Sequence, residues 1–174
     1  MIEIPTLETE RLRLRPYRLD DFEAYEAMWA DPAVVRFIGG TPFTREQSWI
    51  RFLRQIGLWH HLGFGFFALE DRSTGAFAGE AGFHDLHRPI TPSIEGTMES
   101  GWGLVAALQG KGLAEEAMRA AIAWATVNGT GSRFTALIDP GNAASLRVAA
   151  KLGFQRLVDT TYHGSPIVLL ERPR

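Results

Sequence analysis

The chain has 174 residues, of which 45% are hydrophobic and 22% charged, and its formal net charge is -2. This length and balance predict one globular domain with an ordinary core and argue against disorder. A nearly neutral chain offers no electrostatic field that would attract nucleic acid or an anionic membrane surface. The sequence contains no cysteine, which excludes disulfides, thiolate metal sites and a cysteine nucleophile.

The N-terminus and the hydropathy pattern predict where the protein is found. The first residues, MIEIPTLETE, lack the basic region and apolar run that are typical of a signal peptide. No apolar stretch approaches the roughly 20 residues that a membrane helix needs. We therefore expect a soluble cytoplasmic protein with no membrane partner.

The predicted elements alternate irregularly between strands and helices. Period-two alternation predicts the strands, and apolar faces at helical spacing predict the helices. Thr44, with Gln47 three residues later, resembles a capping box that opens one helix. The first half of the chain predicts a strand at 11–15, helices from Asp20 or Asp21 to about 30 and from about 45 to 63, and strands at 64–69, 77–83 and 97–104. The second half predicts a helix from 112 to about 127 that ends at Asn128-Gly129, a strand at 134–138, a helix at 142–152, and strands at 154–162 and 166–171. This order predicts a mixed α+β fold of about seven strands and about four helices, in a single domain spanning residues 1–174.

Residues 99–117, ESGWGLVAALQGKGLAEEA, form the most informative pattern of the chain. A glycine-containing strand leads into a turn at 109–114, and an alanine-rich helix follows. The first N–H groups of a helix have no partner within the helix, and the helix dipole favours an anion at that end. Because the side chains around the turn are small, a phosphate can approach the backbone closely. The turn therefore predicts a site for a phosphorylated ligand.

The presence of Gly101 and Gly103 in a predicted strand requires an explanation, because glycine weakens a strand interior. One interpretation is a β-bulge that separates this strand from its neighbour, and the other is a ligand backbone lying against the strand. Both predict a slot beside the turn at 109–114, where a long ligand pairs its amides with the strand.

These motifs resemble those of one enzyme family. Gln109-Gly110-Lys111-Gly112-Leu113-Ala114 is similar to the Gln/Arg-x-x-Gly-x-Gly/Ala pyrophosphate loop of the GNAT superfamily of acetyl-CoA-dependent N-acetyltransferases. Asn142-Ala-Ala-Ser145 followed by Lys151-Leu-Gly-Phe154, and the opening strand LETERLRLR, resemble segments of its Rim-type ribosomal-protein N-terminal acetyltransferases. The resemblance spans nearly the whole chain. It implies a GNAT-like domain with a mostly antiparallel sheet and splayed central strands.

The resemblance also implies a ligand and the residues that hold it. The N–H groups of the loop would bind the coenzyme A pyrophosphate, the main chain near the end of the preceding strand would pair with the pantetheine arm, and two residues of the Asn-x-x-Ser segment would face the thioester. The implied cofactor-binding residues are Leu104, Val105, Gln109, Gly110, Lys111, Gly112, Leu113, Ala114, Asn142 and Ser145. No metal is implied.

The implied reaction is direct attack of a primary amine on the acetyl carbonyl of acetyl-CoA. A protonated amine cannot attack, so some group must accept its proton. Glu99, in the strand beside the acyl site, is the candidate base, acting through water. Many relatives place a tyrosine five residues before the Phe of Gly-Phe to protonate the leaving thiolate, but this chain has Ala149 there. Ser145 is the nearest substitute and the second catalytic candidate.

Each candidate has a structural alternative that the sequence leaves open. Lys111 can be an ordinary loop lysine, Asn142 can serve only as a helix cap, and Ser145 can be a first-turn residue without a ligand. Glu99 can be a solvated strand residue.

The function and the acceptor also have alternatives. The acceptor is either a protein N-terminus or a small amine, and the protein is expected to be a monomer or a homodimer. Because the usual tyrosine is absent, a non-catalytic module that binds or senses acyl-CoA stays open. A dinucleotide-binding reading of Gly-x-Gly-x-x-Ala at 101–106 fails because Gly110 and Gly112 break the helix that it should open. His84 and His87 lack the helical spacing of a zinc motif.

Overall fold

The computed structural model describes residues 3–128 and 133–173. Within these ranges eight strands form one sheet in the order β1-β2-β3-β4-β5-β6-β8-β7. The strands are β1 (Leu7–Glu8), β2 (Leu12–Arg15), β3 (Phe66–Asp71), β4 (Phe77–His84), β5 (Met98–Leu104), β6 (Arg133–Ile138), β7 (Gln155–Tyr162) and β8 (Ser165–Pro173). The α-helices are α1 (Phe22–Ala30), α2 (Pro32–Val35), α3 (Arg45–Leu62), α4 (Leu113–Asn128) and α5 (Ala143–Lys151).

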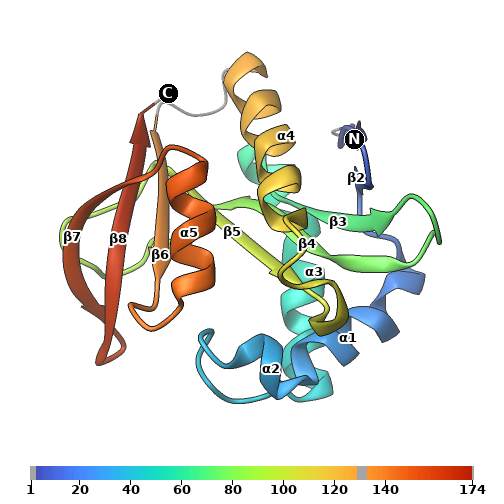
Figure 1. Cartoon of the computed structure of the whole chain (residues 1–174), viewed down its shortest axis with the longest axis horizontal. Coiled ribbons are helices and arrows are strands. Elements are labelled where there is room, and N and C mark those ends of the chain that lie inside the picture. The colour runs from blue at the N-terminus through green and yellow to red at the C-terminus, as the bar shows by residue number, and fades with distance from the viewer. Residues whose placement is uncertain (1–2, 129–132, 174) are drawn as a thin grey trace.

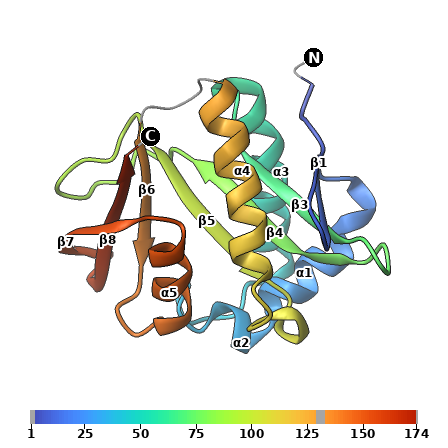
Figure 2. The same ribbon diagram turned by 45° about the horizontal axis from the view of Figure 1, so that its top comes forward.

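The sheet lies between two layers of helices. The helices α4 and α5 cover one face, and α3 covers the other with α1 packed against it (Figures 1 and 2). The larger core cluster joins α4 to β2, β3, β4 and β6, whereas an aromatic cluster joins α1, α2 and α3. The mixed α+β prediction is therefore confirmed, with one more strand and one more helix than expected.

The central strands β5 and β6 are splayed, as the resemblance implies. β5 pairs with β4 in an antiparallel ladder from Glu99 to Leu104, without a break in register. Within the described ranges it pairs with β6, in parallel, only at Met98 and Glu99. Figure 2 shows the two strands spreading apart beyond this point. The edge of β5 that faces β6 is therefore left without a strand partner over most of its length.

The bulge interpretation of the strand glycines is wrong, because the register between β4 and β5 is regular. A Cβ atom on Gly101 would lie 2.7 Å from Cζ of Phe66, which is too close for two carbon atoms. The glycine is needed because the Phe66 ring packs directly on the strand. A Cβ atom on Gly103 would lie 3.9 Å from the Trp29 ring, an ordinary contact distance, so close packing does not explain this second glycine.

Local sequence signals set most of the element boundaries. The capping box of α3 is present, since Gln47 N–H donates to Thr44 Oγ1 at 3.2 Å and Thr44 N–H donates to Gln47 Oε1 at 2.9 Å. Gly63 ends this helix with a φ of 74°. The sequence missed β1 and α2 because two residues and a single turn show no periodicity. Asp21 occupies the N-cap position of α1, but its side chain makes no capping hydrogen bond.

Two further predictions concern the ends of helices and membrane spans. Helix α4 ends at Asn128, and the predicted stop at Gly129 lies outside the described residues. Within residues 3–128 and 133–173, no helix has the length and apolar character that a membrane crossing requires.

Candidate active site

The turn between β5 and α4 presents a row of main-chain N–H groups. Gly110 and Gly112 have φ values of 75° and 79°, a left-handed conformation that glycine adopts without steric cost. The first hydrogen bond at the start of α4 runs from Glu116 N–H to the Gly112 carbonyl at 3.1 Å. In the described part of the chain, the N–H groups of residues 110–115 donate to no protein acceptor. Together with the helix dipole, they form a site suited to an anion.

Side chains hold this turn in place from two sides. Gln109 Nε2 donates to the Leu104 carbonyl at 3.1 Å, which ties the turn to the end of β5. Arg11 donates from Nη1 to the Lys111 carbonyl at 2.9 Å and from Nε to Glu116 Oε2 at 2.7 Å. These contacts use carbonyl and carboxylate acceptors and leave the row of N–H groups unused. The turn is therefore preorganised without its donors being consumed.

The main chain of Val105 differs from what the resemblance implies. Val105 N–H donates to the Ala78 carbonyl at 3.1 Å, and its own carbonyl accepts from Leu108 N–H at 2.9 Å. Because main-chain groups alternate along a strand, those of Trp102 and Leu104 point away from β4 and toward the splayed side. A ligand lying along β5 would therefore find its partners at Trp102 and Leu104 rather than at Val105.

A cavity of about 150 Å³ lies beside the splayed strands. It brings together Glu99, Asn142 and Ser145, which the sequence predicts to face the acyl group, whereas the turn at 109–114 lies outside it. Ala149, by contrast, is fully buried in the core. The cavity is lined by Trp29, Phe37, Ile38, Arg51, Phe66, Glu80, His84, Arg88, Glu99, Ser100, Gly101, Trp102, Leu137, Ile138, Asp139, Asn142 and Ser145.

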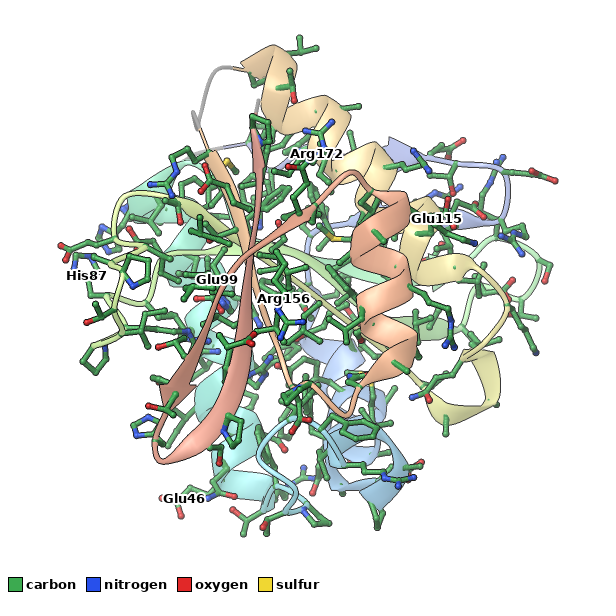
Figure 3. The ribbon with its side chains drawn as sticks, turned by 60° about the vertical axis from the view of Figure 1, so that its left-hand side comes forward. Glu46, His87, Glu99, Glu115, Arg156 and Arg172 are labelled. Carbon is green, nitrogen blue, oxygen red and sulfur yellow. The ribbon has the colours of Figure 1, made fainter. Side chains whose placement is uncertain are left out.

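Glu99 is a buried carboxylate with both oxygens engaged. His84 Nε2 lies 2.8 Å from its Oε1, and Arg88 Nε donates to its Oε2 at 2.6 Å. Burial raises the pKa of Glu99, but the hydrogen bonds from His84 and Arg88, together with the charge of Arg88, outweigh burial and hold the pKa below its usual 4.5. Figure 3 shows Glu99 inside the molecule, whereas His87 lies at the periphery. Glu99 is therefore ionised at neutral pH and is not a solvated strand residue.

A second buried carboxylate, Glu80, lines the same cavity. It accepts hydrogen bonds from Tyr17 Oη at 2.7 Å, Arg51 Nη2 at 2.8 Å and Gln55 Nε2 at 3.3 Å. The Arg51 guanidinium also lies 4.1 Å from the centre of the Trp29 ring, a cation–π arrangement. The cavity thus has two buried carboxylates, Glu80 and Glu99, and each pairs with an arginine.

The start of α5 contributes the other two predicted residues. Ser145 N–H donates to Asn142 Oδ1 at 3.0 Å, so Asn142 caps the helix. Within the described residues, the Asn142 amide nitrogen has no protein acceptor, which leaves it available to a ligand. Capping and ligand binding are therefore compatible at this position.

The histidines of the His84-Asp-Leu-His87 segment lie in different environments. His84 contacts Glu99 inside the cavity, and His87 Nδ1 lies 2.8 Å from Glu95 Oε1 at the surface. Among the described residues, no group of three or more histidine or acidic side chains is arranged to hold a metal ion.

Sequence patterns alone did not place His84 and Glu80 at the site. The information that places them there is the register between two strands. His84 is opposite Glu99 in the ladder between β4 and β5, and Glu80 is opposite Gly103. Because side chains alternate between faces, Glu80, His84 and Glu99 all point to the same face. This alignment is visible only when the register of the two strands is known.

Comparison with known proteins identifies related chains. Residues 11–155 match the model of the "Acetyltransferase (GNAT) domain". The uncharacterized protein YkkB of Bacillus subtilis is 30% identical over 172 residues, which cover 95% of this chain and 94% of YkkB. The structure of a putative GnaT-family acetyltransferase from Bordetella pertussis has a TM-score of 0.85 and 35% identity, covering 97% of this chain and 99% of that one.

A more distant structure has the same fold. RimL, a ribosomal L7/L12 alpha-N-protein acetyltransferase solved with coenzyme A, has a TM-score of 0.78 at 17% identity, covering 97% of this chain and 98% of that one. Similarity at this level shows the fold alone. The comparisons therefore support the family and not the Rim-type subgroup.

Proposed function

Because the chain belongs to the GNAT family of acetyltransferases, we propose that it is an acetyl-CoA-dependent N-acetyltransferase that acts on a primary amine. Acetyl transfer from acetyl-CoA is the reaction of the family. The amine acceptor, the cytoplasmic location, a single domain over residues 1–174 and a monomeric or homodimeric state are parts of our proposal.

One observation carries this proposal: the row of unused N–H groups at 110–115 and the buried cavity lie beside opposite ends of β5. We assign the pyrophosphate of the coenzyme to these N–H groups, with Lys111 adding positive charge. Its pantetheine amides would pair with the main chain of Trp102 and Leu104, and its thioester would lie near Asn142 and Ser145. A Cβ atom added at Gly110 would meet nothing within 4 Å, so the turn has room for a ligand.

Acetyl-CoA supplies an activated acyl group, and residues of the cavity accept a proton from the amine. Most amines are protonated near neutral pH and must lose a proton before attack. Glu99, His84 and Arg88 form a cluster of ionisable side chains in the cavity where we place the acyl group. Ser145 is the proposed hydroxyl beside the leaving thiolate. Its contribution is small, because a thiolate departs readily without a proton.

A non-catalytic module that binds acyl-CoA is the alternative function. Ala149 favours it, because the tyrosine hydroxyl found in many relatives is absent from this position and the site is fully buried. Release of coenzyme A thiol in the presence of an amine separates an enzyme from a sensor.

The acceptor belongs to one of two classes. RimL is named for acetylating a protein N-terminus, which is one class, and small amines are the other. A cavity of about 150 Å³ suits the amine-bearing end of an acceptor in both classes, so the acceptor must be found by experiment.

The function is tested by measuring thiol release from acetyl-CoA with a panel of small amines and N-terminal peptides. We expect release only when an accepted amine is present. Binding of acetyl-CoA without release with any amine would favour the acyl-CoA-binding module.

The coenzyme site is tested separately by calorimetry with acetyl-CoA. Gly112→Glu places a negative charge against the phosphates and should weaken binding at least tenfold, about 1.4 kcal/mol. Gly112→Gln is the matched control, because it has the same bulk and the same backbone strain without the charge. Equal affinities for the two variants would contradict the assignment of the coenzyme pyrophosphate to this loop.

A further inference from the structure

We propose that His84 is the group that accepts the amine proton and that Glu99 is a positioning residue that orients its ring. This inference rests on the proposed N-acetyltransferase function. It reassigns the proton acceptor from the carboxylate, where sequence reasoning put it, to the imidazole beside it.

The contact between His84 and Glu99 fixes the state of the ring. The two side chains are 8% and 6% exposed, and Nε2 lies 2.8 Å from Oε1. An ionised carboxylate only accepts hydrogen bonds, so Nε2 must carry the hydrogen. In a neutral imidazole the other nitrogen, Nδ1, then holds the lone pair that can accept a proton.

The Nδ1 atom is the unused acceptor of the cluster. It is buried and has no hydrogen-bond partner in the described part of the chain, although the ring lines the cavity. An unsatisfied buried polar atom costs about 1–3 kcal/mol, a cost that a bound ligand or water can remove. By contrast, each oxygen of Glu99 already accepts a hydrogen bond, one from His84 and one from Arg88. In our proposal, Nδ1 receives the proton from the amine, directly or through one bridging water.

The charges around His84 favour the neutral ring before the reaction. Glu99 faces it from β5, Arg88 from the loop after β4, and Arg51 from α3. Burial lowers the pKa of His84 most strongly, and the two arginines lower it further, while Glu99 opposes them and the pKa stays below 6.5. The ring is therefore neutral at pH 7. After it accepts a proton, the imidazolium lies against the Glu99 carboxylate, which stabilises the new charge.

The proposed step balances in protons and bonds. One proton passes from the amine nitrogen to Nδ1, directly or through a water. The nitrogen lone pair forms the C–N bond to the acetyl carbonyl carbon, and the C–S bond breaks. The nitrogen, now bonded to the acetyl carbon, loses its second proton to the departing coenzyme A thiolate, and His84 returns its proton to solvent before the next turnover.

The first test measures kcat against pH for three variants, with the amine that gives the fastest thiol release by the wild-type protein. His84→Gln should lower kcat by about 10²-fold and abolish the rise in rate as pH increases through the pKa of His84. Glu99→Gln keeps an oxygen that accepts from Nε2–H, so the rise should persist. It should move to lower pH, because loss of the carboxylate charge lowers the pKa of His84. His87→Gln is the control, since that side chain is 66% exposed.

The pH profiles separate the two assignments. If His84→Gln keeps the rise and Glu99→Gln loses it, Glu99 is the base and our inference is wrong. Circular dichroism and thermal melts of each variant identify a loss of rate that comes from unfolding.

The second test does not depend on the acceptor. Nitrogen NMR of the full-length wild-type protein, without substrates, should show hydrogen on Nε2 and a bare Nδ1 at pH 7, with titration below pH 6.5. A hydrogen on Nδ1 at pH 7 would overturn the inference even if amines are acetylated. Absence of thiol release with every amine would instead contradict the proposed N-acetyltransferase function. The NMR spectrum would still show which nitrogen of His84 carries the hydrogen.

Discussion

At the scale of single residues, a network of buried ion pairs surrounds Arg15, outside the cavity. This arginine is 4% exposed and pairs with two buried carboxylates. It donates to both oxygens of Asp21 at 2.8 and 2.7 Å, and to Glu70 Oε2 at 2.7 Å. The same Asp21 carboxylate accepts from Arg18 N–H at 2.7 Å, which fixes the entry into α1. The network therefore couples the first strands to the helix that covers the cavity.

We expect Arg15→Met to destabilise the protein by about 3–5 kcal/mol, because it leaves the buried Asp21 without its counter-charge and Glu70 with only the more exposed Arg13 and Arg18. Urea denaturation at pH 7 measures the loss. Arg13→Met is the control: Arg13 also contacts Glu70, at 2.8 Å, but its side chain is 39% exposed, and such pairs contribute at most about 1 kcal/mol. Equal losses for the two variants would contradict this account.

The same network predicts how stability depends on pH. The hydrogen bond from Arg15 holds the pKa of Glu70 below its usual 4.5. A carboxyl whose pKa is lowered by folding stabilises the protein above its unfolded pKa and loses that contribution as pH falls. Stability should therefore fall as pH decreases below about 4.5, and less steeply in Glu70→Gln.

At the scale of elements, the start of the short helix α5 contributes both to the stability of the helix and to the lining of the cavity. It has nine residues, and an isolated helix of this length is marginal in water. Its N-cap, Asn142, lines the cavity, so a single side chain both starts the helix and borders the candidate active site.

Two substitutions at Asn142 separate these roles. Asn142→Asp keeps an oxygen that accepts from Ser145 N–H, so stability should stay near the wild-type value. Asn142→Ala removes the cap and should cost about 1 kcal/mol. If the Asn142 amide also donates to acetyl-CoA, both variants should show weaker binding by calorimetry. Wild-type affinity in Asn142→Asp would restrict the residue to capping.

At the scale of the whole molecule, the sheet consists of two parts joined at a narrow place. Strands β1 to β5 form one part and β6 to β8 the other, and among the described residues the strand ladder joins them only at Met98 and Glu99 of β5 (Figure 1). A ligand seated between β5 and β6 replaces strand pairing that the protein lacks there. Binding should therefore stabilise the molecule across this junction.

Hydrogen exchange with and without acetyl-CoA measures this effect. At a ligand concentration of 100 Kd, global stability should rise by about 2.7 kcal/mol. Amides of Trp102, Leu104 and residues 110–115 should gain additional protection, because they are the proposed donors to the ligand. The paired strands β3 and β4 are the internal control. Protection confined to other regions would contradict the proposed position of the coenzyme.

The sequence by itself determined the features that depend on local chemistry. The capping box at Thr44 set the start of α3, and the glycines at 110 and 112 set a turn with left-handed backbone angles. The order of elements predicted a mixed sheet, and the loop motif predicted the family. These signals are short-range, so they can be read without knowing which strands are neighbours.

The tertiary structure alone decided the features that depend on register and burial. The pairing of β4 with β5 placed His84 against Glu99 and engaged both oxygens of the carboxylate. The N–H group of Val105, a predicted ligand residue, donates to Ala78, and the Phe66 ring explained Gly101. Each of these contacts joins residues that are distant in sequence, and a shift of one residue in register would reverse the face on which a side chain lies. Local patterns do not contain that information, which is why the sequence predicted Glu99 at the site but not the histidine that shares it.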